Sequence, residues 1–362
     1  MSNARKLADN LPSVGQLGNR NVIINGEFAI SQRGTSFTNI GSAGTYDDTY
    51  TLDRFLISQG VSAGRCTVTQ ESDTPTGFSN SLKIATTTAD TSIAAGEYHR
   101  LQTKFEGQNL QRFAKGTTGA KEFTLSFYCK ANAAATYVVE LVDNDNTRSV
   151  SKTFSVTTDW TRVIVTFPAD TTGAFTNDAN LSMEVNWWMH AGSTYSSGTL
   201  QTTWGAIVAA NRAAGINSIF DSTSRTFFIT GVQLEVGSQA SPFEHEQHSV
   251  TLAKCQRYTF VHQTDSDYDW AALSGYCNTT TNALSFYQFP VKMRASPTLT
   301  TSGSFQILDG FTSYTISSSS LSQSSPLSAR VDVASSGLTV GRHIAVRNLG
   351  DSGAKLIFSA EL

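Results

Sequence analysis

The chain has 362 residues, a length that suits two domains of about 150 residues each. Charged residues make up only 15% of it, while 21 Phe, 11 Tyr and 5 Trp supply more aromatic surface than a disordered chain carries. The net charge of −3 gives no basic footprint for nucleic acid, and no apolar run approaches the roughly 18 residues of a membrane span. Composition therefore predicts a globular protein that binds no nucleic acid and has no membrane insertion.

Residues 1–21 form the first predicted segment, an N-terminal arm. It holds one short apolar pattern, Leu7, Leu11 and Val14, which is too small to bury a face of its own. Arms of this kind become ordered by docking on something else. The same stretch lacks the apolar core of a signal peptide, so we expect the protein to be made and assembled in a cytoplasm.

Strand patterns with a period of two dominate residues 22–246. In FTLSFYCK, the residues Phe123, Leu125 and Phe127 alternate with polar ones, which predicts a strand with its apolar side in a core. The segments YVVELVD and RSVSKTFSV flank an Asn-Asp-Asn turn and predict a hairpin. A long strand, RTFFITGVQLEVG, contains Gly231 as an expected bulge. Short strands with frequent turn signals are typical of a β-sandwich.

Two adjacent tryptophans, Trp187 and Trp188, lie in the predicted strand EVNWWMH. Neighbours on a strand face opposite sides, so we expect one ring in the core and the other at the surface. An exposed tryptophan could stack on a sugar ring, fill a subunit interface or pack against its own chain. Both residues are therefore candidate carbohydrate-binding residues.

Residues 247–258 predict a linker with a short helix, which Ser249 can cap and which turns Leu252 and Cys255 inward. The four cysteines of the chain are widely spaced, which excludes a tight zinc knuckle or a dense disulfide scaffold. We expect each of them to be a small buried apolar residue.

Residues 259–362 return to strand patterns and predict a second β domain. In SFYQFPVKMRASPTLTTSG, Pro290 and Pro297 lack backbone donors, so they belong at strand ends or sheet edges. Serines crowd residues 317–325, which predicts a loop inside this domain. The whole pattern predicts an all-β protein, with two antiparallel β-sandwich (jelly-roll-like) domains in series after an N-terminal docking arm.

The segment TDSDYDWAAL carries two further candidate residues, Tyr268 and Trp270. Acidic and aromatic residues together resemble an adaptable binding loop, and a hairpin tip with one anchored ring is the alternative. The chain has no G-x-S-x-G, H-E-x-x-H or phosphate-loop motif. We therefore expect no enzyme and no catalytic residue, although a carboxylate pair need not be close in sequence.

Four segments resemble a pattern that recurs in virion proteins of tailed bacteriophages, especially tail-fibre-like proteins. They are NVIINGEFAISQRGTSF from Asn21, ITGVQLEVGSQASPFEHE from Ile229, CQRYTF from Cys255, and FPVKMRASPTL together with the terminal FSAEL. The resemblance implies a jelly roll like those of carbohydrate-binding modules in residues 22–246. It also implies a C-terminal head domain in residues 259–362.

The same resemblance implies a structural protein of the virion, a tail-fibre or fibre-like appendage protein that serves host attachment. It implies a homotrimer, contacts with other virion proteins through the arm and a host surface glycan as ligand. A capsid decoration protein is the alternative in the same class, and a polysaccharide depolymerase is the alternative in another. Jelly rolls of this kind often carry a structural calcium, which would lie near Asp47 or Asp48, and no other cofactor is implied.

Overall fold

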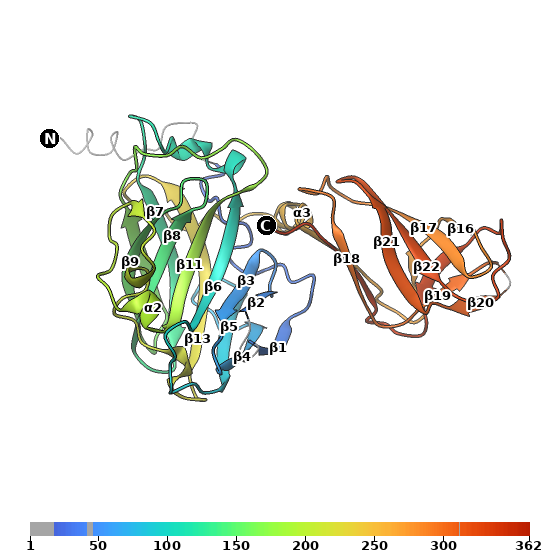
Figure 1. Ribbon diagram of the computed structural model, residues 1–362, viewed down its shortest axis with the longest axis horizontal. Helices are drawn as coiled ribbons and strands as arrows, with labels where there is room; N and C mark the ends of the chain where they lie inside the picture. Colours follow the sequence, from blue (N-terminus) through green and yellow to red (C-terminus); the bar gives the residue numbers. More distant parts are fainter. Residues whose placement is uncertain (1–17, 42–45, 311) are drawn as a thin grey trace. The chain divides into compact units, whose positions relative to one another are not determined.

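The computed structural model describes residues 18–41, 46–310 and 312–362, which form two compact units (Figure 1). The first unit extends to Gln247, and the second comprises His248–Glu361. The predicted arm falls almost wholly outside the described residues. Among the residues that the structure describes, no helix is long and apolar enough to cross a membrane.

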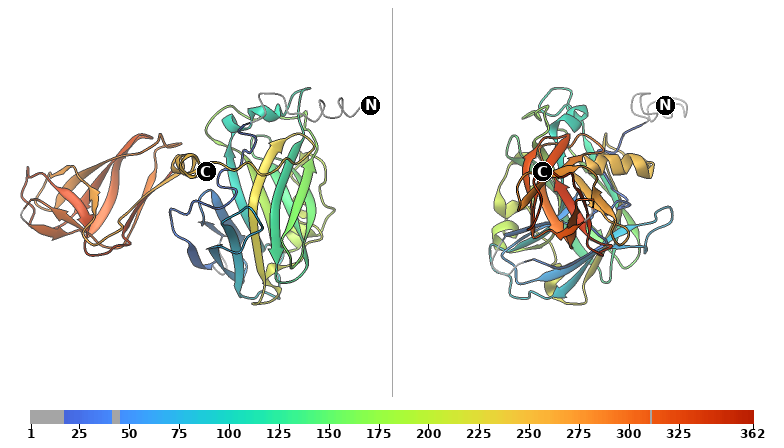
Figure 2. Two further views of the ribbon diagram at one scale, coloured as in Figure 1. Left: turned by 180° about the vertical axis from the view of Figure 1, so that it is seen from behind. Right: turned by 90° about the vertical axis from the view of Figure 1, so that its right-hand side faces the viewer.

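Two antiparallel sheets form the first unit and lie face to face as layers (Figures 1 and 2). The six-stranded sheet has the order β1-β4-β5-β13-β7-β10, and the seven-stranded sheet has the order β12-β9-β8-β11-β6-β3-β2. This arrangement is the predicted sandwich. The strands are β1 (Ser36–Ile40), β2 (Tyr46–Tyr50), β3 (Phe55–Gly60), β4 (Arg65–Glu71), β5 (Ser81–Thr88), β6 (Tyr98–Glu106), β7 (Phe123–Ala131), β8 (Ala135–Asp143), β9 (Arg148–Val156), β10 (Thr161–Phe167), β11 (Leu181–Ala191), β12 (Gly205–Ala206) and β13 (Thr226–Val236).

The core of the first unit lies between its two sheets. Phe123, Leu125 and Phe127 on β7 are fully buried there, which confirms the alternation read from the sequence. The predicted hairpin is also present, since β8 and β9 pair along their whole length. Helical structure in this unit is short: α2 (Ser193–Ser196), η2 (Gly107–Asn109), η3 (Gln111–Phe113), η4 (Ala209–Asn211) and η5 (Ile219–Asp221).

The segment NVIING runs beside β13, so two of the four resembling segments meet in the first unit. Asn21 accepts hydrogen bonds from the backbone N–H groups of Ile23 (2.9 Å) and Leu234 (3.0 Å). Gly26 approaches so closely that a Cβ at this position would lie 2.1 Å from the carbonyl oxygen of Val232. Gly231 has a φ of +62° and sits where the register of β13 against β7 shifts, which confirms the predicted bulge.

The second unit contains three antiparallel sheets with the orders β14-β24-β18, β15-β23-β19-β20 and β16-β17-β22-β21. Its core gathers apolar residues from all three sheets. Its elements are α3 (His248–Gln256), β14 (Thr259–Gln263), β15 (Trp270–Ala272), β16 (Gly275–Cys277), β17 (Asn282–Gln288), β18 (Thr298–Ser302), β19 (Phe305–Leu308), β20 (Ser313–Thr315), β21 (Ser318–Ser324), β22 (Ser328–Ala334), β23 (Ala345–Asn348) and β24 (Lys355–Ser359).

The connection between β17 and β18 closes the second unit. Met293 is fully buried, and Arg294 donates to the carbonyl oxygens of Ala360 (2.8 Å) and Glu361 (3.0 Å). The backbone N–H of Arg294 also binds the carbonyl of Arg257 (2.7 Å). The other two resembling segments, CQRYTF and FPVKMRASPTL with FSAEL, therefore meet here. Arg294 has a structural role, because it ties the β17–β18 connection to both of its neighbours.

Two sequence-based expectations for the second unit need correction, and one strand was not foreseen. Thr251, and not Leu252, joins Cys255 as a buried residue of α3, which begins at His248. The serine-rich stretch is not a loop, because most of it forms β21 and pairs with β22. β19 (Phe305–Leu308) was not expected at all, since four residues are too few to show a clear period. All four cysteines are buried and free, as expected.

Candidate functional site

Trp187 and Trp188 are both fully buried, so the expectation that one of them is exposed is wrong. Trp187 lies in the core between the sheets and packs against Phe127 with ring centroids 5.9 Å apart. Trp188 faces the outer side of the seven-stranded sheet, as the alternation of β11 requires. There it is covered by a satellite cluster that includes Val138 and Ala213.

The cover of Trp188 is held by a buried ion pair. Arg212 donates to both carboxylate oxygens of Glu140 at 2.8 Å, and the indole Nε1 of Trp188 donates to the same carboxylate at 2.8 Å. The guanidinium lies 4.9 Å from the centre of the indole ring. Burial lowers the pKa of Arg212, but the charge and hydrogen bonds of Glu140 outweigh it and raise the pKa. Trp188 is thus a structural residue, with no free ring face for a sugar.

The predicted loop in the second unit does expose its two aromatic rings. Tyr268 is 51% exposed and Trp270 is 40% exposed. Arg347 pairs with Trp270 across β15 and β23, and its guanidinium lies 4.9 Å from the Tyr268 ring centre and 5.7 Å from the Trp270 ring centre. These three side chains form the aromatic cluster, which is the candidate binding site.

Buried polar contacts hold the loop that carries this cluster. Asn348 is fully buried and donates to Thr264 Oγ1 (2.9 Å) and to the carbonyl oxygen of Ser266 (2.7 Å). Asp269 accepts the backbone N–H groups of Asp265 (3.1 Å) and Trp270 (2.8 Å), and these bonds lower its pKa. The loop therefore presents its rings from a fixed base, beside a carboxylate that is ionised near neutral pH.

The two candidate calcium ligands, Asp47 and Asp48, are successive residues of β2 and therefore point to opposite faces. Asp47 accepts hydrogen bonds from the N–H of Gly41 (3.2 Å) and the hydroxyl of Thr49 (2.8 Å). Neither aspartate belongs to a cluster of three candidate metal ligands within the described ranges. A calcium site at Asp47 or Asp48 therefore stays a prediction.

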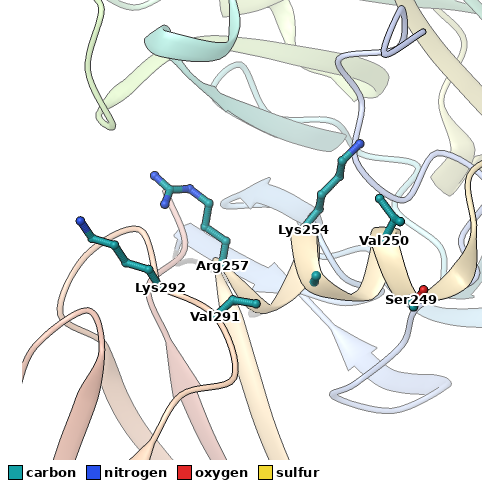
Figure 3. Close-up of a pocket in the computed structure, with 7 residues that line it drawn as sticks. Ser249, Val250, Lys254, Arg257, Val291 and Lys292 are labelled. Atoms are coloured by element: carbon teal, nitrogen blue, oxygen red, sulfur yellow. The ribbon is translucent and has the colours of Figure 1, made fainter.

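A shallow groove in the second unit carries basic side chains (Figure 3). Lys254 and Arg257 lie on or just after α3, Lys292 lies on the connection after β17, and all three project in the same general direction. Val250 and Val291 contribute apolar surface to the same groove. The groove offers positive charge, but without an aromatic ring it lacks a platform for a sugar.

The fold and the aromatic cluster define a class: an all-β protein of two sandwich units whose second unit exposes a polar–aromatic loop. No protein-family model matches the chain, and no curated protein matches it.

Three solved structures show what the chain is similar to. One is a CBM4 carbohydrate-binding module, with 15% identity, 59% of this chain and 97% of that chain covered, and a TM-score of 0.30. Another is the enzymatically active domain of tailspike protein 4 of bacteriophage CBA120, with 15% identity and a TM-score of 0.30. The match covers 60% of this chain and only 21% of that chain. A third is a family 11 carbohydrate-binding module from Clostridium thermocellum in complex with a mixed-linked tetrasaccharide, with 10% identity and a TM-score of 0.29. The match covers 57% of this chain and 100% of that chain. Values this low carry no inference about what this chain binds.

Proposed function

We propose that the protein is a structural component of a tailed-phage virion, of the tail-fibre-like kind, and that its second unit contacts a glycan on the host surface. The resemblance of four sequence segments to such proteins supports the first part. The aromatic cluster of Tyr268, Trp270 and Arg347 supports the second, and it is the observation that carries the proposal.

The chemistry of the cluster suits a sugar. A sugar ring has an apolar face of C–H groups, which packs on the face of an exposed aromatic ring, and a rim of hydroxyls that need polar partners. Trp270 and Tyr268 supply two rings, while Arg347 and Asp269 supply a donor and an acceptor beside them. Because Asn348 already fixes the loop, little conformational entropy is lost on binding.

Binding of the purified full-length chain to an array of bacterial surface polysaccharides tests this function. Trp270→Ala removes about 60 Å² of apolar contact, worth about 1.5 kcal/mol, so we expect a roughly tenfold loss of affinity. Tyr276→Ala is the matched control, because Tyr276 is an equally exposed ring (41%) on the next strand. The absence of any glycan ligand, or equal binding by wild type and Trp270→Ala, would contradict the proposal.

The two alternatives are separated by other measurements. A capsid decoration protein would be found on the head when intact particles are labelled with antibody to this chain, whereas an appendage protein would be found on the tail. A depolymerase would release reducing ends from the polysaccharide that it binds. The proposal has no catalytic step, so it expects binding without release of product.

Assembly is part of the same proposal. Residues 1–21 are proposed to attach the protein to other virion proteins, and the chain is proposed to act as a homotrimer located in the virion. Ile357 on β24 is half-buried on the face opposite the core residues Leu356 and Phe358, which leaves apolar surface for a neighbouring subunit to cover. Deletion of the arm is expected to leave a folded protein that fails to join particles.

A further inference from the structure

A cluster of three candidate metal ligands lies at one end of the first unit, remote in sequence from the aromatic cluster. Asp90 follows β5, Glu97 precedes β6 and His190 lies near the end of β11. One ligand atom from each lies within 4.8 Å of the others, and all three residues are buried. His190 is fully buried, Asp90 is 5% exposed and Glu97 is 6% exposed.

Two atoms of this cluster face each other without a hydrogen-bond partner. The Nε2 atom of His190 lies 3.5 Å from Oε2 of Glu97, and neither atom makes a hydrogen bond to any residue that the structure describes. Buried polar atoms nearly always form hydrogen bonds, because a buried atom without one has lost its hydrogen bonds to water and gained none in the protein. A cation between the imidazole nitrogen and the carboxylate would satisfy both atoms at once.

The surroundings of the imidazole orient it for such a cation. Ser218 Oγ accepts the backbone N–H of Phe220 (3.0 Å) and lies 2.7 Å from Nδ1 of His190. When Nδ1 donates its proton to this hydroxyl, the lone pair of Nε2 points into the cluster. Histidines that bind metals are usually held in this way by their second nitrogen. Phe220 also packs against the imidazole, with ring centroids 5.2 Å apart, and helps to exclude water.

The Asp90 carboxylate is likewise oriented by its neighbours. Its Oδ2 accepts hydrogen bonds from Ser62 Oγ (2.8 Å) and from the N–H of Ala63 (2.9 Å). These contacts bring the turn between β3 and β4 to the cluster. A metal ion bound here would therefore join the connection between β5 and β6 to strand β11 and, through Asp90, to the turn between β3 and β4.

We propose that Asp90, Glu97 and His190 form a structural zinc site. One imidazole nitrogen with two carboxylate oxygens is a ligand set that Zn²⁺ accepts, whereas Ca²⁺ and Mg²⁺ take oxygen ligands. Ligands about 2.1 Å from a tetrahedral zinc are about 3.4 Å apart, which matches the distance between Nε2 of His190 and Oε2 of Glu97. Water would fill the fourth position.

Zinc binding by the untagged full-length chain, freed of metal by a chelator, tests the site. We expect the protein to take up one Zn²⁺ per chain in competition with a chromophoric chelator. A free zinc concentration a hundredfold above the dissociation constant should raise the Tm of the first unit by roughly 5–10 °C. Co²⁺ in the same site should give visible absorption bands of tetrahedral intensity. Absence of Zn²⁺ uptake, or stabilisation by Ca²⁺ alone, overturns the proposal.

Variants locate the binding to these residues. Glu97→Gln keeps the shape of the side chain, and its amide can donate to His190, so the variant should fold yet bind zinc at least a hundredfold more weakly. Ser218→Ala removes the hydroxyl that positions the imidazole and should weaken binding by about 10–100-fold. His248→Gln changes an exposed histidine of the second unit and should leave binding unchanged. Equal zinc affinity in wild type and Glu97→Gln would refute the assignment.

Discussion

Replacing Arg212 with Met should destabilise the first unit strongly, because it leaves the buried carboxylate of Glu140 without its ion-pair partner. The side chain of Glu140 is fully buried, and Arg212 binds it through two hydrogen bonds of 2.8 Å. Removing one partner of a buried ion pair costs about 3–5 kcal/mol, since the remaining charge keeps its desolvation penalty. Met retains most of the apolar contact with Trp188, so the lost charge dominates the expected change in free energy of unfolding.

Urea unfolding followed by tryptophan fluorescence measures this cost, since Trp187 and Trp188 report on the first unit. Arg225→Met is the matched control: Arg225 also pairs through two hydrogen bonds, but its partner Asp221 is 42% exposed. Such a pair is worth under about 1 kcal/mol. Adding Glu140→Gln to Arg212→Met should recover part of the loss. If Arg212→Met and Arg225→Met cost the same, the buried carboxylate is not the cause.

Three other predictions concern the core, acid stability and assembly. Phe127→Ala should lower the free energy of unfolding in urea by about 3–5 kcal/mol. Lys130→Ala, which breaks a surface ion pair with Asp73, should lower it by under about 1 kcal/mol, and equal losses would contradict the assigned faces of β7. Burial raises the pKa of Asp170, but hydrogen bonds from Arg148, the backbone and Lys115 outweigh it and lower the pKa below 3.8. Its ionised form therefore stabilises the fold above pH 3.8, and the stability gap between wild type and Asp170→Asn should shrink as the pH falls below that value; a constant gap would contradict this. Light scattering of the full-length chain should give three times the monomer mass, and a stable monomer would rule out the trimer.

Local alternation was enough to predict much of the fold. The period of two in FTLSFYCK identified the buried face of β7, because a strand with one side in a core has to place Phe123, Leu125 and Phe127 on that side. Gly231 marked a bulge, since it adopts a positive φ that other residues rarely take. The exposed rings of Tyr268 and Trp270 were also predictable, because acidic neighbours keep such a loop at the surface.

Features that depend on distant parts of the chain were not predictable. Alternation placed Trp187 and Trp188 on opposite faces correctly, but it could not show that residues 192–217 would cover the outer one. The partner of Glu140 lies 72 residues away, and His190 lies still further from Asp90. No spacing in the sequence links these residues, because the order of strands in a sheet decides which of them meet. For the serine-rich β21, pairing with β22 overrides a sequence with little apolar pattern.

The central place of β13 has a consequence for synthesis of the chain. In the six-stranded sheet β13 lies between β5 and β7, and the NVIING segment binds to it as well. The sheet therefore cannot close until residue 236 has left the ribosome, long after β5 and β7 have been made. Until then both strands present open edges, which are sites for mispairing between nascent chains. We expect the yield of folded protein to depend on chaperones that shield these edges during translation, and to rise when translation is slowed at low temperature.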